Sequence, residues 1–327
     1  MPGSALVTGA RGFVGAWLSR ALLERGYQVV SLDRARAEPQ PSGLTLLGID
    51  DEVADVEGGV QDAELVRRAL WEHRVETVFH LAAQTIVATA AQSPVATFET
   101  NVRGTWILLE ACRAAGVERV VVASSDKAYG RHRELPYRED FPLAPTAPYE
   151  ASKAAADVIA RSYWRSYGLP VAVTRFANLY GGADTNFSRL VPETVTAALE
   201  GRRPVLRSDG SPERDFLYVE DAAAAYLMIA EALDREGVRG EAFNAGGGTP
   251  HAVGDVVALI TRLAGGGMEP EIRGDGTPPG EIDRQYVDPT KIREVVGWRP
   301  AFDLEEGLRR TIEWYRDHPE VRAPGPQ

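Results

Sequence analysis

The residues GARGFVG, from Gly9 to Gly15, follow directly on a predicted strand, Ala5–Thr8, and open a helical pattern, Val14–Arg25. A dinucleotide diphosphate requires close approach of the backbone and the positive end of a helix, and glycines permit both. The next β-rich run ends at Asp33, whose carboxylate can accept hydrogen bonds from the adenosine ribose hydroxyls. This order of strand, glycine-rich turn, helix and acidic residue predicts a dinucleotide-binding fold.

The rest of the first half repeats this alternation of short β-rich runs and longer helical patterns. Near-continuous apolar strands indicate burial on both faces, as in a parallel sheet covered by helices. The predicted fold class is therefore α/β, a Rossmann-like doubly wound parallel sheet with a smaller, discontinuous C-terminal substrate domain. The expected strands are 5–8, 28–33, 77–81, 119–124, 171–176 and 241–244, and the expected helices are 14–25, 63–72, 102–115, 149–167 and 219–233.

The character of the sequence changes after Tyr180, where paired glycines and several prolines interrupt the regular alternation. We expect residues 1–179 to form the NAD-binding domain, with residues 215–248 returning to it. Residues 180–214 and 249–321 are expected to form the substrate domain. Residues 322–327 are expected to be a flexible tail.

Composition restricts the class of protein. The 327 residues are 44% hydrophobic and 25% charged, which is typical of a folded protein with a full core. A formal net charge of -11 argues against nucleic acid as a partner. The single cysteine and the absence of a Cys/His cluster predict no metal site and no internal disulfide. No apolar run approaches the roughly 20 residues that span a bilayer, so we expect no membrane segment and a cytoplasmic location.

The glycine spacing, G-x-x-G-x-x-G, resembles the short-chain dehydrogenase/reductase superfamily, specifically its extended, NAD-dependent epimerase/dehydratase branch acting on nucleotide sugars. One such motif is weak support, but several in family order are strong. The matching stretches are HLAAQ (80–84), NVRGT (101–105), YEASK (149–153), RFANLYG (175–181) and RDFLYVED (214–221).

The resemblance implies NAD as a tightly bound, recycled cofactor. Asp33 disfavours a 2′-phosphate, but the adjacent Arg34 leaves NADP as a less favoured alternative. The chain departs from the family pattern at Gly59, where an Asp usually contacts the adenine amino group. The candidate cofactor-binding residues are Gly9, Gly12, Phe13, Val14, Gly15, Asp33, Arg34, Leu81, Ala82, Ala83, Tyr149 and Lys153.

Tyr149 and Lys153 are four residues apart in a helical pattern and so share one helix face. A tyrosine is a poor base at neutral pH because its usual pKa is about 10. The Lys153 ammonium and the positive nicotinamide ring would both stabilise the phenolate and lower that pKa. With Ser125 as a hydrogen-bond partner of the sugar oxygen, this pair predicts proton transfer at a sugar hydroxyl. The alternative is an exposed surface pair.

The stretch SSDKAYG, from Ser124 to Gly130, indicates the reaction. Adjacent ionisable residues are not needed to move a hydride, but eliminating water across C5 and C6 needs an acid and a base. Asp126-Lys127 resembles the CDP-glucose 4,6-dehydratase type, which implies Asp126 as the acid and Lys127 as the base. A lysine can serve as a base only where desolvation or a neighbouring positive charge lowers its pKa. The alternative is a solvated turn with a weak salt bridge.

The candidate substrate-binding residues are Gln84, Asn178, Arg189, Arg214 and Arg284. The arginines could hold a diphosphate through charge-assisted hydrogen bonds, and surface ion pairs are the alternative. The resemblance also implies a homodimer, in which helices 102–115 and 158–167 form a four-helix bundle with their copies. These helices could equally only cover the sheet.

The functional hypothesis is an NAD-dependent nucleotide-sugar 4,6-dehydratase, a hydro-lyase that converts an NDP-hexose to its 4-keto-6-deoxy sugar. Its substrate would be CDP-glucose or a GDP- or UDP-hexose. A 4-epimerase or 4-ketoreductase using the same Tyr149 and Lys153 is the alternative within enzymes. A non-catalytic protein that binds NAD or a nucleotide sugar is the alternative outside them.

Overall fold

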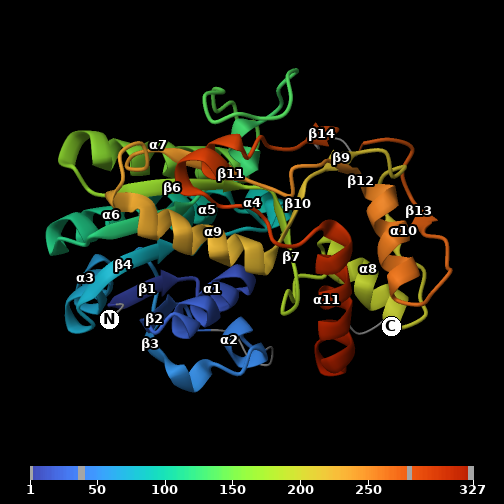
Figure 1. Cartoon of the computed structure of the whole chain (residues 1–327), viewed down its shortest axis with the longest axis horizontal. Helices are drawn as coiled ribbons and strands as arrows, with labels where there is room; N and C mark the ends of the chain where they lie inside the picture. Colours follow the sequence, from blue (N-terminus) through green and yellow to red (C-terminus); the bar gives the residue numbers. More distant parts are fainter. Residues whose placement is uncertain (1–2, 36–40, 278–281, 323–327) are drawn as a thin grey trace.

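The computed structural model describes residues 3–35, 41–277 and 282–322, and its centre is a seven-stranded parallel sheet (Figure 1). The strands follow one another across the sheet in the order β11-β6-β5-β4-β1-β2-β3. Their bounds are β1 Ser4–Thr8, β2 Gln28–Asp33, β3 Val53–Glu57, β4 Val75–His80, β5 Arg119–Ala123, β6 Val171–Phe176 and β11 Ala242–Ala245.

The strand order places the ligand crevice. The chain enters at β1, moves outward to β2 and β3, and then returns to β4 on the other side of β1. In open parallel sheets ligands bind outside the carboxyl ends of the strands at such a reversal. The glycine-rich turn that follows β1 lies at this position. The α/β, Rossmann-like class predicted from the sequence is confirmed.

Helices cover both faces of the sheet (Figure 1). One hydrophobic cluster joins the sheet to α1 (Phe13–Glu24) and α9 (Val219–Glu231). A second cluster, on the opposite face, joins it to α3 (Ala63–Glu72), α6 (Gly104–Ala115) and α7 (Pro148–Tyr167). Since the strands are buried on both faces, their near-continuous apolar composition has a direct cause.

Several elements differ from the sequence prediction. Strand β3 was missed because it lies at the edge of the sheet and three of its five residues are exposed, so it lacks a continuous apolar run. Helix α6 begins at Gly104 rather than at 102, since a π-helical turn occupies residues 99–103. Helix α8 (Leu190–Leu199) lies in a segment expected to be irregular, and it accommodates Pro192 within its first turn, where no backbone donor is lost.

A group of C-terminal helices lies beside the sheet layer (Figure 1). These are α8, α10 (Val253–Leu263) and α11 (Leu304–Asp317), which share a third hydrophobic cluster. The remaining elements are α2 Gly43–Leu46, α4 Val87–Gln92, α5 Pro94–Phe98, β7 Asn178–Tyr180, β8 Val205–Leu206, β9 Glu213–Arg214, β10 Phe216–Tyr218, β12 His251–Ala252, β13 Glu271–Ile272 and β14 Arg284–Gln285. Strand β11 joins the main sheet, as expected for a returning segment. The domain boundaries themselves stay a prediction, and the predicted tail from 323 onward lies outside the described residues.

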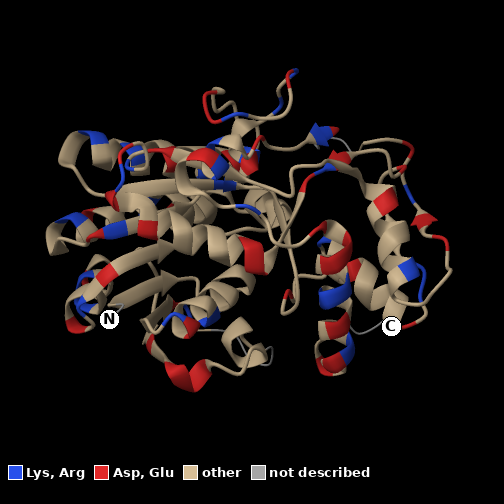
Figure 2. Ribbon diagram, in the orientation of Figure 1, with Lys and Arg blue, Asp and Glu red and all other residues tan. Residues whose placement is uncertain are grey.

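Charges are interspersed along the outer helices, as Figure 2 shows for α11. Arg309 pairs with Glu305, and Arg310 with Glu306, one helical turn apart. Within the described residues no helix is long and apolar enough to cross a membrane, and no group of His, Cys, Asp and Glu could hold a metal ion. Cys112 is a buried residue of α6.

Candidate active site

The turn after β1 is shaped for close approach of a ligand to the backbone. Gly9 adopts a positive φ of 77°, and a Cβ added at Gly15 would lie 2.1 Å from the Gly9 carbonyl oxygen. Helix α1 begins immediately afterwards at Phe13, so its positive end faces the turn. The carbonyl oxygen of Gly9 accepts from the Gly12 amide at 3.0 Å, which closes the turn. These contacts fit a dinucleotide diphosphate.

Asp33 is the last residue of β2 and lies beside the same turn. Its carboxylate oxygens accept from the backbone amides of Arg11 and Arg34, each at 3.0 Å. Burial raises the pKa of Asp33, while these two amides act in the opposite direction. At the family's usual adenine-contacting position Gly59 has no side chain, and nearby Gln61 donates to the Thr100 hydroxyl at 3.0 Å.

Leu81, Ala82 and Ala83 follow β4 and lie against the glycine-rich turn. The Ala82 amide donates to the Thr8 hydroxyl at 3.1 Å, and Gly9 packs so closely that a Cβ there would lie 2.9 Å from that amide. His80 lies between the hydroxyls of Thr8 and Thr105, at 2.8 and 3.0 Å. Burial lowers the pKa of His80 to about 3, so it is a neutral structural group.

Helix α7 holds Tyr149 and Lys153 at the end of β5. Lys153 Nζ donates to the Ala123 carbonyl at 2.8 Å, and the Ser124 hydroxyl donates to the Lys153 carbonyl at 3.1 Å. Both Tyr149 and Lys153 are buried, which overturns the alternative of an exposed surface pair.

The pKa values of Tyr149 and Lys153 differ from the expectation that the Lys153 charge lowers the pKa of Tyr149. Burial raises the pKa of Tyr149 to about 12, and the Ser125 hydroxyl is the main group that lowers it, followed by the charge of Arg189. Lys153, whose Nζ donates to the Ala123 carbonyl, is not among the groups that lower it. Burial lowers the pKa of Lys153 itself to about 8. In this structure Ser125, rather than Lys153, therefore lowers the Tyr149 pKa most.

Asp126 and Lys127 begin a short 3-10 helix, Asp126–Tyr129, which Ser125 caps by accepting from the Lys127 amide at 3.2 Å. Asp126 is only 2% exposed, and its Oδ1 accepts from the Ser125 hydroxyl at 3.1 Å. Its Oδ2 is buried and has no hydrogen-bond partner among the described residues. A solvated turn is therefore wrong, because a solvated carboxylate would expose both oxygens.

Lys127 extends from the same turn toward β7. Its Nζ donates to the Asn178 side-chain oxygen at 3.3 Å and lies 3.9 Å from Asp126 Oδ1. The Asn178 amide group in turn donates to the Asp215 carbonyl at 3.2 Å. Asn178, predicted as a diphosphate ligand, thus positions Lys127 in this structure, and its contact with substrate stays a prediction.

Asp215 is a buried carboxyl that sequence reasoning missed as a site residue. It is 0% exposed; its Oδ1 accepts from the Gly247 amide at 2.8 Å, and its Oδ2 has no hydrogen-bond partner within the described part of the chain. The stretch RDFLYVED (214–221) contains two aspartates, Asp215 and Asp221, and the sequence does not tell their roles apart. In the structure the Asp221 carboxylate is structural, because it accepts hydrogen bonds from the backbone amides of Ala301 and Phe302. Burial raises the pKa of Asp215 to about 7, with a smaller contribution from the charge of Asp126.

The raised pKa of Asp215 predicts a pH dependence of stability. The folded protein keeps a proton on this group between its unfolded pKa near 3.8 and about 7, whereas the unfolded chain loses it. This contribution is therefore present at low pH and is lost as pH rises toward 7, by about 1.4 kcal/mol per pH unit. Asp215→Asn keeps the oxygen that accepts from Gly247 and removes the titration.

Denaturant unfolding of both proteins at pH 5 and pH 8 measures the effect. Asp215→Asn should gain about 2–3 kcal/mol relative to the wild type between these two pH values. Taking the difference between the proteins cancels the contribution of other groups, such as His80. Parallel pH profiles would contradict a protonated Asp215 in the folded state.

The three predicted substrate arginines fall into two groups. Arg189 pairs with the buried Asp184 at 2.9 Å, and its guanidinium lies 6.0 Å from the Phe13 ring beside the glycine-rich turn. Arg214 and Arg284 lie on the paired strands β9 and β14.

Arg284 is ion-paired with Glu213, and Arg214 donates to the Glu213 carbonyl at 2.9 Å. Gln84 follows β4, and its backbone amide donates to the Asn101 side-chain oxygen at 2.7 Å. The register of the two strands places Arg284 opposite Glu213 and Arg214 opposite Gln285, so the two arginines are offset by one residue. Substrate binding by Gln84 and the arginines stays a prediction.

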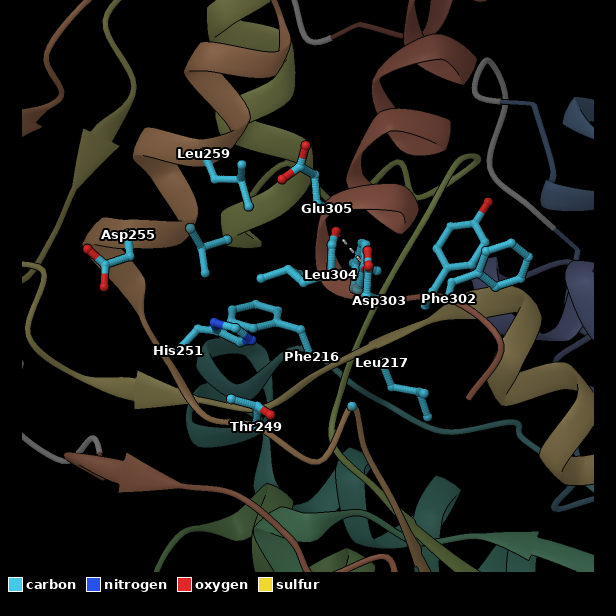
Figure 3. Close-up of a pocket in the computed structure, with 14 residues that line it drawn as sticks. Phe216, Leu217, Thr249, His251, Asp255, Leu259, Phe302, Asp303, Leu304 and Glu305 are labelled. Atoms are coloured by element: carbon cyan, nitrogen blue, oxygen red, sulfur yellow. Dashed lines mark hydrogen bonds between the residues drawn. The ribbon is translucent and has the colours of Figure 1, made fainter. Parts of the chain in front are cut away.

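A cavity of about 350 Å³ lies between β10, α10 and the start of α11 (Figure 3). Phe216 and His251 line it, together with Asp255 and Leu304 (Figure 3). None of the predicted catalytic residues lines this cavity. It is therefore separate from the group formed by Ser125, Tyr149 and their neighbours.

The fold and this site define a dinucleotide-binding protein with a Ser-Tyr-Lys group, and comparison with known proteins identifies the family. A protein-family model described as GDP-mannose 4,6 dehydratase matches residues 6–311. The dTDP-glucose 4,6-dehydratase of Streptomyces antibioticus is 36% identical, with 96% of this chain and 92% of that protein covered. The chain belongs to the family of nucleotide-sugar 4,6-dehydratases and epimerases.

Solved structures of a 4,6-dehydratase and of a 4-epimerase both resemble the chain. The dTDP-glucose 4,6-dehydratase of Bacillus anthracis in complex with NAD has a TM-score of 0.86 at 31% identity, covering 97% of this chain and 98% of that one. The UDP-glucose 4-epimerase of Thermotoga maritima with UDP-glucose has a TM-score of 0.88 at 31% identity, with 96% and 99% covered.

A longer relative is also similar. A trifunctional UDP-glucose 4,6-dehydratase/UDP-4-keto-6-deoxy-D-glucose 3,5-epimerase/UDP-4-keto-L-rhamnose-reductase of Arabidopsis thaliana is 33% identical over 98% of this chain. The chain spans 48% of that protein, about half its length.

Proposed function

We propose that the protein is an NAD-dependent nucleotide-hexose 4,6-dehydratase. The observation that carries this proposal is the burial of Asp126, whose Oδ2 has no hydrogen-bond partner among the described residues, next to Lys127. Burying a carboxylate without a partner costs free energy, so such a group is retained where a ligand or a reaction uses it. Oxidation at C4 alone has no use for this second acid–base pair.

The glycine-rich turn and Asp33 would hold the cofactor, with Leu81–Ala83 beside it. A Cβ at Gly15 would clash with the Gly9 carbonyl, and the Asp33 carboxylate is bonded to the Arg11 amide of the same turn, so these residues fit a dinucleotide. When bound, NAD supplies the acceptor for a hydride and later its donor. Lys153 would contact the nicotinamide ribose.

The first chemical step belongs to Tyr149. Its phenolate would take the proton of the sugar 4-hydroxyl while Ser125 donates a hydrogen bond to the same oxygen, so that C4 becomes a ketone. The Ser125 hydroxyl already lowers the pKa of Tyr149 in the structure. The new ketone acidifies the proton on C5, because the resulting carbanion is conjugated with it.

The second step belongs to Lys127 and Asp126. The C5–H bond breaks and its proton passes to the Lys127 amine, while the C6–O bond breaks and the hydroxyl takes a proton from Asp126. Water leaves, and a double bond forms between C5 and C6. Asn178 positions the Lys127 amine at 3.3 Å. Hydride return to C6 and protonation at C5 complete the 4-keto-6-deoxy sugar, with no net consumption of NAD.

The substrate would be a nucleotide diphosphate hexose, with CDP-glucose or a GDP- or UDP-hexose as the candidates from the sequence and dTDP-glucose as the substrate named for the Streptomyces relative. Arg214 and Arg284 are proposed to bind its diphosphate through charge-assisted hydrogen bonds. Incubating the purified protein with CDP-, GDP-, UDP- and dTDP-hexoses in heavy water tests reaction and nucleotide together. Mass spectrometry should show loss of one water and one deuterium retained in the product.

A 4-epimerase is the second candidate, favoured by the similarity to the Thermotoga maritima enzyme. It predicts an isomer of unchanged composition in the same assay, and full activity in variants lacking Asp126 and Lys127. Binding of cofactor with no hydride exchange on any of these sugars would indicate a non-catalytic binding protein instead. The cytoplasmic location stays a prediction.

We also propose a homodimer formed through the helices on one face of the sheet. Large apolar side chains are exposed on α5, α6 and α7, at Val95, Phe98, Trp106, Val158 and Tyr167. A group of this kind on neighbouring helices is typical of an interface between proteins. Helix α7 contains the segment 158–167 expected from the sequence to pair with its copy, and α6 covers residues 104–115 of the other expected segment, 102–115.

A charge on α7 should therefore separate the subunits. Val158 is 59% exposed, so Val158→Arg should fold normally while placing a charge in the proposed interface. Light scattering should give a dimer of the 35.5 kDa chain for the wild type and a monomer for the variant. Ile272→Arg, on β13 at 57% exposure, is the control and should stay dimeric. A monomeric wild type would overturn the proposal.

A further inference from the structure

The glycine-rich turn includes an arginine, Arg11, near the expected position of the adenosine ribose. Its backbone amide donates to Asp33 Oδ2 at 3.0 Å, which places Arg11 beside the carboxylate proposed to bind the ribose hydroxyls. A guanidinium is the side chain best suited to bind a phosphate through paired hydrogen bonds. Arg11 is thus located where it could bind the 2′-phosphate that distinguishes NADP from NAD.

The Arg11 guanidinium is instead bound to carboxylates of the protein. Nη2 lies 2.5 Å from Asp55 Oδ2, and Nη1 lies 3.9 Å from Glu57 Oε2. Nη1 also donates to the carbonyl of Arg34 at 3.4 Å. The Arg11 side chain is 20% exposed, so most of it is withdrawn from solvent.

These carboxylates come from the edge strand β3, which the sequence analysis missed. Residues two apart on a strand point to the same face, so Asp55 and Glu57 lie on one side of β3. The parallel register places Glu57 opposite Asp33 on β2. Asp33, Asp55 and Glu57 therefore lie on one face of β2 and β3, beside the Arg11 guanidinium.

We propose that the ion pair between Arg11 and Asp55 makes the site selective for NAD over NADP, an inference that rests on the proposed dinucleotide cofactor. Asp33 repels a 2′-phosphate directly. Asp55 acts separately, by occupying the guanidinium that would otherwise bind the phosphate. A 2′-phosphate would thus meet a net negative site and would have to break the Arg11–Asp55 pair.

Binding of NADH and NADPH to the purified full-length protein tests this, with energy transfer from tryptophan to the reduced nicotinamide as the signal. Asp55→Asn should tighten NADPH binding about tenfold, the effect of one charge-assisted hydrogen bond, and should leave NADH binding within about twofold. Asp55 is 46% exposed on an edge strand, so the substitution leaves the core intact. Thermal melting checks the fold.

Two further variants identify the cause. Asp51→Asn removes the same charge from the neighbouring 3-10 helix, Asp50–Glu52, and should leave NADPH binding unchanged. Arg11→Ala combined with Asp55→Asn should abolish the gain, since the released guanidinium is then missing.

The outcomes separate this inference from the proposed cofactor. A gain that requires Arg11 supports the inference. It is overturned if Asp55→Asn gives no gain, if Asp51→Asn gives an equal gain, or if the gain persists without Arg11. A wild-type protein that binds NADH, with no gain in the variant, overturns the inference alone. A wild type that binds neither dinucleotide overturns the proposed cofactor as well.

Discussion

The Lys127→Met variant is expected to oxidise C4 of the nucleotide hexose and to stop before water is lost. Methionine has a similar length and fills the same space, but it cannot accept the C5 proton. Asp126 and Tyr149 both keep their contact with the Ser125 hydroxyl, and Asp126 loses only its 3.9 Å ion pair with Lys127. Loss of general base catalysis should reduce formation of the 4-keto-6-deoxy sugar by about 10²–10⁴-fold.

Two measurements define the step that fails. Exchange of the C5 hydrogen with heavy water should be lost to the same extent as product formation. Quenching with borodeuteride and mass spectrometry should detect the 4-ketohexose, which gains one deuterium at C4 and retains its 6-hydroxyl.

Lys291→Met is the matched control. Lys291 lies 2.6 Å from Glu241, outside the proposed site, so its substitution should preserve turnover. Full dehydratase turnover by Lys127→Met would rule out Lys127 as the base.

The Tyr149→Phe variant is expected to lose the first step and therefore every later one. The phenol oxygen is the proposed acceptor of the 4-hydroxyl proton, and phenylalanine removes that oxygen while keeping the ring in its buried position. Turnover should fall by about 10²–10⁴-fold, and no 4-ketohexose should be trapped by borodeuteride. The C5 hydrogen should not exchange either, since the C4 ketone that acidifies it never forms.

The two variants thus differ in a way that structural damage would not reproduce. Lys127→Met should accumulate the ketone, whereas Tyr149→Phe should yield none. Tyr167→Phe, on the same helix at 62% exposure, is the control and should retain full activity. Trapping of the ketone by Tyr149→Phe at the wild-type rate would contradict Tyr149 as the acid–base group.

Local sequence was sufficient for the elements that carry the cofactor. The turn from Gly9 to Gly15 requires glycine because the backbone at Gly9 has a positive φ and Gly15 touches the Gly9 carbonyl. The apolar strand at 119–124 and the helix with Tyr149 and Lys153 have periodicities that only burial in a covered parallel sheet explains. For these residues the local pattern and the tertiary fold impose the same constraint.

Tertiary structure alone decided the charges and partners of the site. In the sequence, Asp126-Lys127 is equally compatible with a solvated turn. Burial of this turn against the sheet and α7 excludes that alternative. Asp215 resembles any motif aspartate in the sequence, yet its pKa is raised to about 7 by burial.

The pair of Arg11 with Asp55 joins residues 44 positions apart through an edge strand that has no continuous apolar run. A sequence pattern reports which face of an element is apolar. Solvation and charge partners depend on distances between segments, which exist only once the chain has folded.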